Sequence, residues 1–205
     1  MSKKNVKRNK GFTLVELIVV LVILAILAAI LVPALLGYID RAKQEKSVRK
    51  VHDIQVASTS ALVEYYGIYK DKVSKKFTPK NYTVNGRTVR GYSVTNFTFA
   101  KLQDKNSSGN DCSDAVAKRI LQYLESNKDT KEKEYTFKKY DSATYGKSAS
   151  EIANAGAEGL IILFGEDYKL SVIQYSDLDG YLYTYDAQSG EIDVQKNGSF
   201  VATGK

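Results

Sequence analysis

The sequence predicts an α+β protein in which a long N-terminal α-helix packs, by its second half, on a C-terminal antiparallel β-sheet. Two observations carry this prediction. The first is an apolar run near the N-terminus that passes without a break into a stretch of helical periodicity. The second is the last third of the chain, where short β-type segments alternate with turn dipeptides.

The apolar run extends from Leu17 to Ile39, and its 23 residues carry no formal charge. As a helix it would be about 34 Å long, enough to cross the hydrocarbon core of a membrane. A secretory signal peptide has a shorter apolar region that ends in a small-residue cleavage site, and this run does not fit that pattern. A plain membrane anchor fits the length but gives no reason for the carboxylate of Glu16. Five basic residues precede the run and five follow it closely, so the positive-inside rule does not choose an orientation.

Helical spacing continues beyond the apolar run. We therefore expect one helix from Phe12 to Tyr66, about 82 Å long and ended by Gly67. Residues 12–39 are apolar all round, whereas residues 40–66 are amphipathic, so a folded domain can cover only the second segment. The apolar positions of the second segment are Val48, Val51, Ile54, Ala57, Ala61, Leu62 and Tyr65.

Residues 67–157 are predicted to form a connecting αβ region. Asn85-Gly86 between two short β-type segments indicates a hairpin over residues 82–89, and residues 94–99 are a further candidate strand. A helix is expected from Ser113 to Leu124. A short helix, capped by Ser148 or Ser150 and closed by Gly156, is expected to end at Asn154.

Residues 158–205 are predicted to form the antiparallel sheet. Turn signals at Gly165-Glu-Asp, Asp179-Gly180 and Ser189-Gly190 separate four β-type segments and indicate a meander. The four segments are residues 159–164, 168–175, 181–185 and 191–196.

The stretch from Lys10 to Leu17, Lys-Gly-Phe-Thr-Leu-Val-Glu-Leu, resembles the processing site of type IV prepilins. These are the precursors of the subunits of type IV pili and of related type II secretion and DNA-uptake filaments. The resemblance is close over residues 3–50 and covers a short basic leader, Gly-Phe, a Glu as the fifth residue from Phe12, and an unbroken apolar helix. It implies the type IV pilin fold. It also implies that a prepilin peptidase removes residues 1–11 by cutting between Gly11 and Phe12, and that the new amine of Phe12 is methylated.

The resemblance also implies a role for Glu16, with Thr13, in setting the register between subunits. An unpaired carboxylate in an apolar helix bundle is costly, and the cationic amine of Phe12 on a neighbouring subunit would neutralise it. The alternative is that Glu16 lies at the level of the lipid headgroups and pairs with Lys10 or water. Pro33 is expected to kink or locally melt the helix, helped by Gly37, although membrane helices also tolerate such residues.

Candidate chemical sites are few. We expect no catalytic residues, no enzyme activity and no cofactor, because His52 is the only histidine and Cys112 the only cysteine. A weak calcium candidate is Asp177 with Asp179, but Asp-Gly is first of all a turn signal. A single cysteine excludes the internal disulfide of many pilins, which makes the chain similar to clostridial and other Gram-positive members.

The formal charge of +7 does not by itself indicate a nucleic-acid partner, because five of the positive charges lie in the leader. Charge is segregated along the rest of the chain. Residues 70–101 hold eight basic residues against Asp71, and residues 148–195 hold nine acidic residues against Lys169. Two solvated faces, contact between the basic and acidic segments of neighbouring subunits, and binding of the basic segment to DNA or an acidic surface are the alternatives.

The resemblance implies a major pilin that polymerises into an extracellular type IV pilus used in adhesion, aggregation and surface motility. The alternative is a minor pilin or a pseudopilin of a type II secretion or DNA-uptake system. The implied partners are other copies of the chain, the prepilin peptidase and an assembly platform in the membrane. The precursor would span the cytoplasmic membrane once, with its leader inside, before it enters the filament.

Overall fold

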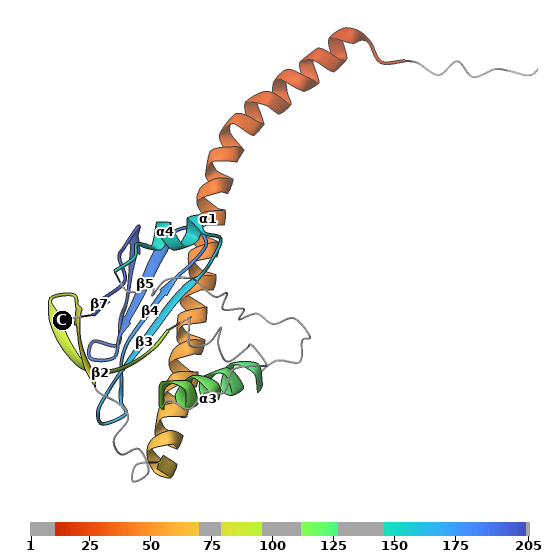
Figure 1. Ribbon diagram of the computed structural model, residues 1–205. Helices are drawn as coiled ribbons and strands as arrows, with labels where there is room; N and C mark the ends of the chain where they lie inside the picture. The colour runs from red at the N-terminus through yellow and green to blue at the C-terminus, as the bar shows by residue number, and fades with distance from the viewer. Residues whose placement is uncertain (1–10, 70–78, 96–111, 127–145, 204–205) are drawn as a thin grey trace, which may run out of the picture. The chain divides into compact units, whose positions relative to one another are not determined.

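The computed structural model describes residues 11–69, 79–95, 112–126 and 146–203 (Figure 1). The predicted leader therefore lies outside the described residues, apart from Gly11. The chain divides into two compact units, of which the first ends at Glu45 and the second begins at Lys46. A long N-terminal helix is followed by an antiparallel sheet, which confirms the predicted α+β fold class.

Helix α1 extends from Leu14 to Tyr69 and contains 56 residues. By length and composition, it is the one helix among the described residues that could cross a membrane, and its apolar part is exposed in the single chain. Pro33 lies inside the helix without ending it. Gly67, the predicted stop, remains helical and does not adopt the left-handed conformation of a C-terminal cap, so the helix continues for two more residues.

The described residues form one seven-stranded sheet in the order β6-β5-β4-β3-β2-β1-β7, with antiparallel neighbours throughout. The predicted C-terminal meander is confirmed, because β3 to β6 are successive neighbours. Their bounds are Gly159–Gly165, Leu170–Ser176, Tyr181–Asp186 and Ile192–Lys196.

The sheet extends into the predicted connecting region. Strands β1 (Lys80–Val84) and β2 (Arg87–Thr95) form the predicted hairpin, and β2 then pairs with β3. Gly91 allows this pairing, because a Cβ atom there would lie 2.1 Å from the carbonyl oxygen of Phe164. The candidate strand over residues 94–99 is the end of β2 as far as Thr95, and residues 96–99 lie outside the described part of the chain.

The outer edge of β1 pairs with β7, a strand of two residues (Ala202–Thr203) that was not predicted. At the tip of the hairpin, Asn85 and Gly86 have φ values of 48° and 76°. Positive φ at both central residues is the requirement of the tight hairpin turn that Asn-Gly favours.

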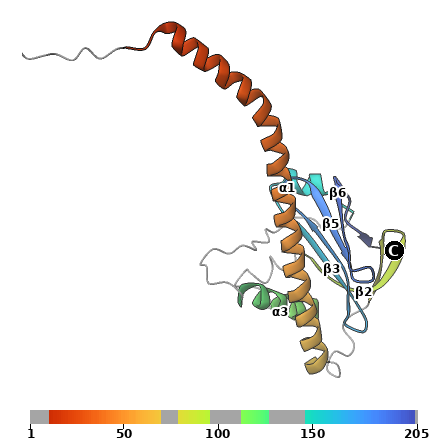
Figure 2. The same cartoon turned by 180° about the vertical axis from the view of Figure 1, so that it is seen from behind.

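Both faces of the sheet are buried. On one face, α1 and α3 (Cys112–Ser126) pack on the sheet through residues such as Ile54, Leu62 and Ile120, and both views show α3 beside the C-terminal part of α1 (Figures 1 and 2). On the other face, Ile152 of α4 (Ala149–Asn154) packs with Phe200. Strand β3 serves both cores: Leu160, Ile162 and Phe164 lie in the first, and Ile161 and Leu163 in the second.

Ser148 caps α4, as one of the two predicted alternatives. It accepts a hydrogen bond from the backbone N of Glu151, whose side chain accepts one from the backbone N of Ser148. This reciprocal pair satisfies two donors that a helix leaves without partners at its start. It lowers the pKa of Glu151, because both bonds favour the ionised carboxylate.

Candidate processing and assembly site

The Gly11–Phe12 peptide bond lies in a non-helical segment just before α1. Phe12 is 84% exposed. A Cβ atom on Gly11 would meet no other atom within 4 Å, so packing in the described chain does not require glycine at this position. The bond is therefore exposed in the single chain.

Thr13 and Glu16 form a capping box on the first turn of α1. The backbone N and the Oγ1 of Thr13 each donate a hydrogen bond to Oε2 of Glu16, both at 2.8 Å. The backbone N of Glu16 donates to Oγ1 of Thr13 at 3.3 Å. Such bonds satisfy orphan donors at the helix start, where the helix dipole also favours a negative charge.

The predicted partners of Glu16 were a neighbouring chain, Lys10 or water, and the structure adds Thr13. The sequence signal for this contact is Thr-Leu-Val-Glu at residues 13–16, a capping-box pattern directly before an apolar run. Within the described residues, both bonds to the carboxylate end on Oε2 and Glu16 forms no ion pair. Oε1 thus accepts neither of these two bonds.

Pro33 and Gly37 lie inside the continuous part of α1. A Cβ atom on Gly37 would meet no other atom within 4 Å. The helix is continuous through both residues in the single chain, so the kink stays a prediction for the assembled helix. A methyl group added at Gly37 would meet no other atom of the described chain.

Asp177, between β4 and β5, is buried and accepts four hydrogen bonds. Its Oδ1 accepts from the backbone N of Asp179 at 3.1 Å and of Tyr181 at 2.9 Å. Its Oδ2 accepts from the hydroxyls of Tyr183 at 2.7 Å and Ser47 at 3.2 Å. Protein donors thus occupy both oxygens, and the described residues contain no group of three or more His, Cys, Asp or Glu side chains arranged for a metal. This geometry gives the calcium alternative no support.

A second polar cluster joins α1 to the sheet. Lys50 Nζ lies 2.7 Å from Glu158 Oε1 and 3.2 Å from the hydroxyl of Tyr175, which donates to the same Glu158 oxygen at 2.7 Å. Burial, and next the charge of Glu158, raise the pKa of Tyr175. Burial and the bond to Asp177 likewise raise the pKa of Tyr183. Both phenols therefore remain protonated donors at neutral pH, and α1 is held by directional bonds as well as by apolar packing.

Two residues of the basic segment pair with the acidic segment of the same chain. Arg87 Nη2 lies 2.9 Å from both carboxylate oxygens of Asp186, and its Nη1 donates to Gln188. Arg90 Nε donates to Glu166 at 2.7 Å. For these two residues the segregated charges meet within a subunit. The remaining residues of that segment, apart from Lys80, lie outside the described part of the chain, namely Lys70, Lys72, Lys75, Lys76 and Lys101.

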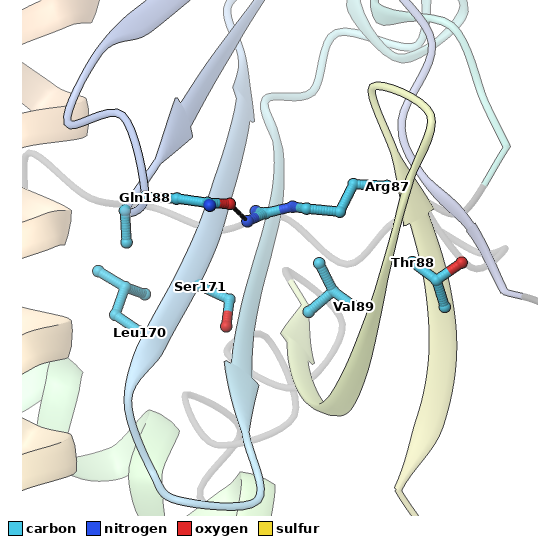
Figure 3. Close-up of a pocket in the computed structure, with 7 residues that line it drawn as sticks. Arg87, Thr88, Val89, Leu170, Ser171 and Gln188 are labelled. Carbon is cyan, nitrogen blue, oxygen red and sulfur yellow. Dashed lines mark hydrogen bonds between the residues drawn. The ribbon is translucent and has the colours of Figure 1, made fainter.

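A pocket of about 390 Å³ lies where β4 begins and β5 ends (Figure 3). Figure 3 shows the Arg87 side chain reaching across the pocket to Gln188. Val89, Leu170 and Ala187 supply the apolar part of its lining, and Ser171 adds a hydroxyl. Among the described residues, Arg87 is the only titratable group that lines the pocket.

The two remaining candidates are His52 and Cys112. His52 is exposed, and its Nδ1 lies 3.2 Å from Gln55 Oε1. Cys112 begins α3, but its side chain lies outside the described part of the chain.

Residues 6–32 match the family model of the prokaryotic N-terminal methylation motif. The matched segment contains the Gly11–Phe12 bond, the Thr13–Glu16 capping box and the first half of the apolar run. No curated protein and no solved structure matched the chain. The methylation motif, an exposed bond at the predicted processing position and a helix long enough to cross a membrane thus occur together.

Proposed function

We propose that this chain, which carries the N-terminal methylation motif of type IV pilins and pseudopilins, is the major subunit of an extracellular type IV pilus. The observation that carries the proposal is an exposed, non-helical Gly11–Phe12 bond directly before a capped Glu16 and a long apolar helix. The precursor is held in the cytoplasmic membrane with its leader inside and its C-terminal domain outside. The filament serves adhesion, aggregation and surface motility.

Processing is the first step of the proposed function. A membrane-embedded prepilin peptidase hydrolyses the Gly11–Phe12 bond, which consumes one water and leaves a carboxylate on Gly11 and an amine on Phe12. A sulfonium methyl donor then transfers one methyl group to this amine: the S–CH₃ bond breaks, an N–CH₃ bond forms, and one proton leaves the nitrogen. The product is a secondary amine that still accepts a proton. The mature chain loses the five basic leader residues and gains one positive charge four residues before Glu16.

Assembly is the second step. The apolar part of α1 is exposed in the single chain, so other copies of this helix are the natural cover for it once an assembly platform moves the subunit out of the membrane. Because Thr13 engages Oε2 of Glu16, we assign Oε1 to the Phe12 amine of a neighbouring subunit. Subunits docked out of register would bury an unpaired carboxylate, which is strongly unfavourable.

The second candidate function is that of a minor pilin or a pseudopilin of a secretion or DNA-uptake system, because the same motif serves these proteins. The abundance of the chain in filaments sheared from the cell surface distinguishes the two. A major pilin is the principal protein of such material. A structural role is proposed over an enzymatic one because the N-terminal methylation motif is that of pilins and pseudopilins.

Mass spectrometry of the N-terminus of sheared filament protein tests the proposed function. We expect a chain that starts at Phe12 and carries one methyl group on its amine. Sheared filament protein that still starts at Met1 would contradict the proposal, because the leader would then remain on the working protein.

Replacing Gly11 with Ala is expected to block leader removal and to leave only precursor in the membrane. The physical reason lies in the peptidase, because the added methyl group meets no atom of the folded chain. The ratio of precursor to mature chain on a gel measures the effect. Gly37→Ala is the matched control, since it adds a methyl group in equally open space and should be processed normally. Normal processing of Gly11→Ala would rule out the assigned cleavage position.

Replacing Thr13 with Val is expected to weaken the first turn of α1 by about 1 kcal/mol, because the hydroxyl that bonds Glu16 is lost. The carboxylate is then less fixed, and the filament yield per processed subunit should fall. Thr13→Ser keeps the hydroxyl and should restore the yield. Equal yields for Val, Ser and the original Thr would show that this bond has no part in assembly.

A further inference from the structure

The chain contains two Asn-Gly pairs, Asn85-Gly86 and Asn197-Gly198, and both asparagines are exposed. An asparagine before a glycine can lose its side-chain amide without an enzyme, because the backbone N of the glycine attacks Cγ of the asparagine. Glycine favours this attack, since it has no Cβ atom to shield the nitrogen or to restrict the backbone. The two pairs share this local chemistry, so only their surroundings in the fold can make them differ.

The Asn197-Gly198 pair is fixed by three backbone hydrogen bonds. The backbone N of Asn197 donates to the carbonyl of Gly180 at 2.8 Å, and the backbone N of Gly198 donates to the carbonyl of Gln195 at 3.4 Å. The carbonyl of Gly198 accepts from the backbone N of Ala149, the first residue of α4, at 2.8 Å. A Cβ atom on Gly198 would lie 3.0 Å from a side chain of β5, so this glycine also packs on the sheet. The nitrogen that would attack is therefore engaged, and its release breaks contacts with the rest of the domain.

The Asn85-Gly86 pair forms the tip of the β1–β2 hairpin, between the paired residues Val84 and Arg87. Within the described residues, neither the side chain of Asn85 nor the backbone N of Gly86 takes part in a hydrogen bond. A Cβ atom on Gly86 would meet no other atom within 4 Å. A rotation that brings this nitrogen to Cγ of Asn85 therefore disturbs the turn alone.

We propose that Asn85 is a modification site at which the folded chain deamidates spontaneously, whereas Asn197 is protected. The backbone N of Gly86 bonds to Cγ of Asn85, the bond from Cγ to the side-chain nitrogen breaks, and ammonia leaves with the proton of the Gly86 amide. Water then opens the cyclic imide. Opening at Cγ gives an aspartate, and opening at the backbone carbonyl gives an isoaspartate, in which the chain runs through Cγ. Water is the one added reactant and ammonia the one released product.

The isoaspartate product changes the hairpin beside the pocket. It adds one atom to the backbone between Val84 and Arg87, which pair directly across a two-residue turn. Arg87 joins the hairpin to Asp186 and lines the pocket, so the modification loosens this end of the sheet. Each chain thus carries a chemical record of its age. The inference applies equally to a pilin and to a pseudopilin, so its failure would leave the proposed function untouched.

Peptide mapping of the full-length chain in detergent tests the proposal. Folded samples and samples unfolded in denaturant are kept side by side at neutral pH and then digested briefly at mildly acidic pH, where the reaction is slow. Trypsin separates the two sites, because it cuts after Lys80, Arg87 and Lys196. Mass spectrometry measures the loss of amide from each peptide, and chromatography separates the aspartate from the isoaspartate form.

In denaturant, we expect the two asparagines to react at similar rates. In the folded chain, we expect Asn85 to react about tenfold faster than Asn197, a factor that corresponds to about 1.4 kcal/mol of additional opening cost at Asn197. Equal rates in the folded chain, or a faster reaction at Asn197, would overturn the proposal. So would a folded chain in which Asn85 stays intact although it reacts in denaturant, because the turn itself would then protect it.

Asn85→Gln is the matched variant, because the peptide that trypsin releases from the hairpin also contains Asn81. Glutamine must close a larger ring and reacts far more slowly, so the variant peptide should keep its mass over the same period. The rate at Asn197 should stay unchanged, which shows that the fold is intact. An undiminished loss of amide from the hairpin peptide of Asn85→Gln would place the reaction at Asn81 and refute the assignment.

Discussion

Replacing Glu16 with Ala is expected to abolish filaments while leader removal and membrane insertion continue. Without the carboxylate, the Phe12 amine of a neighbouring subunit has no anion in the apolar bundle, which costs on the order of 3 kcal/mol. This corresponds to a loss of about a hundredfold in filament yield. The measurement is the amount of sheared filament protein relative to processed protein in the cells.

Glu16→Gln separates the charge of this side chain from its role in the helix cap. Glutamine still accepts hydrogen bonds from Thr13, as the capping box requires, but it carries no charge. We expect Gln to fail as Ala does. Filaments from Glu16→Gln at the normal yield would show that the capping box alone accounts for the residue.

Replacing Asp177 with Ala is expected to lower the free energy of unfolding of the C-terminal unit by about 3 kcal/mol. The change removes four hydrogen bonds and leaves the hydroxyls of Tyr183 and Ser47 without their acceptor. Chemical unfolding of the full-length chain in detergent, followed by near-ultraviolet circular dichroism of its tyrosines, measures the loss.

Two variants control for the removal of a negative charge. Asp193→Ala removes an exposed carboxylate on β6 and should change the stability by less than about 0.5 kcal/mol. Asp177→Asn keeps the shape and part of the hydrogen bonding, so its loss should lie between the two alanine variants. A stability for Asp177→Ala equal to that of Asp193→Ala would contradict the structural role of this carboxylate.

The sequence predicts those parts of the fold whose signals are local. The uncharged run, the helical spacing after it and the turn dipeptides of the meander each span a few residues, and α1 and β3 to β6 follow from them. The pairing of β2 with β3 joins Gly91 to Gly165, and a hairpin has the same local pattern whether or not it joins a sheet. Strand β7 is too short for any periodicity.

The residues of the candidate site likewise fall into those with a local sequence signal and those whose contacts are distant in sequence. Gly11, Phe12 and Glu16 are found from the sequence because their order relative to the apolar run is the signal. The bonds of Thr13 also follow a local pattern, the capping-box spacing of Thr13 and Glu16. The ion pair of Arg87 with Asp186 joins residues 99 positions apart. The segregated charges of the sequence predict that the two segments attract each other, but not which residues pair.

The bonds of Ser47 and Lys50 to the sheet have a mechanical consequence. Ser47 lies one residue after Lys46, where the second unit begins, and Lys50 lies three residues further along the helix. A pull on the helix from its N-terminal side is therefore transmitted to the domain first through the contacts with Asp177 and Glu158. Since these contacts are directional bonds to carboxylates of the sheet domain, the domain should resist being peeled from its helix when a filament is stretched.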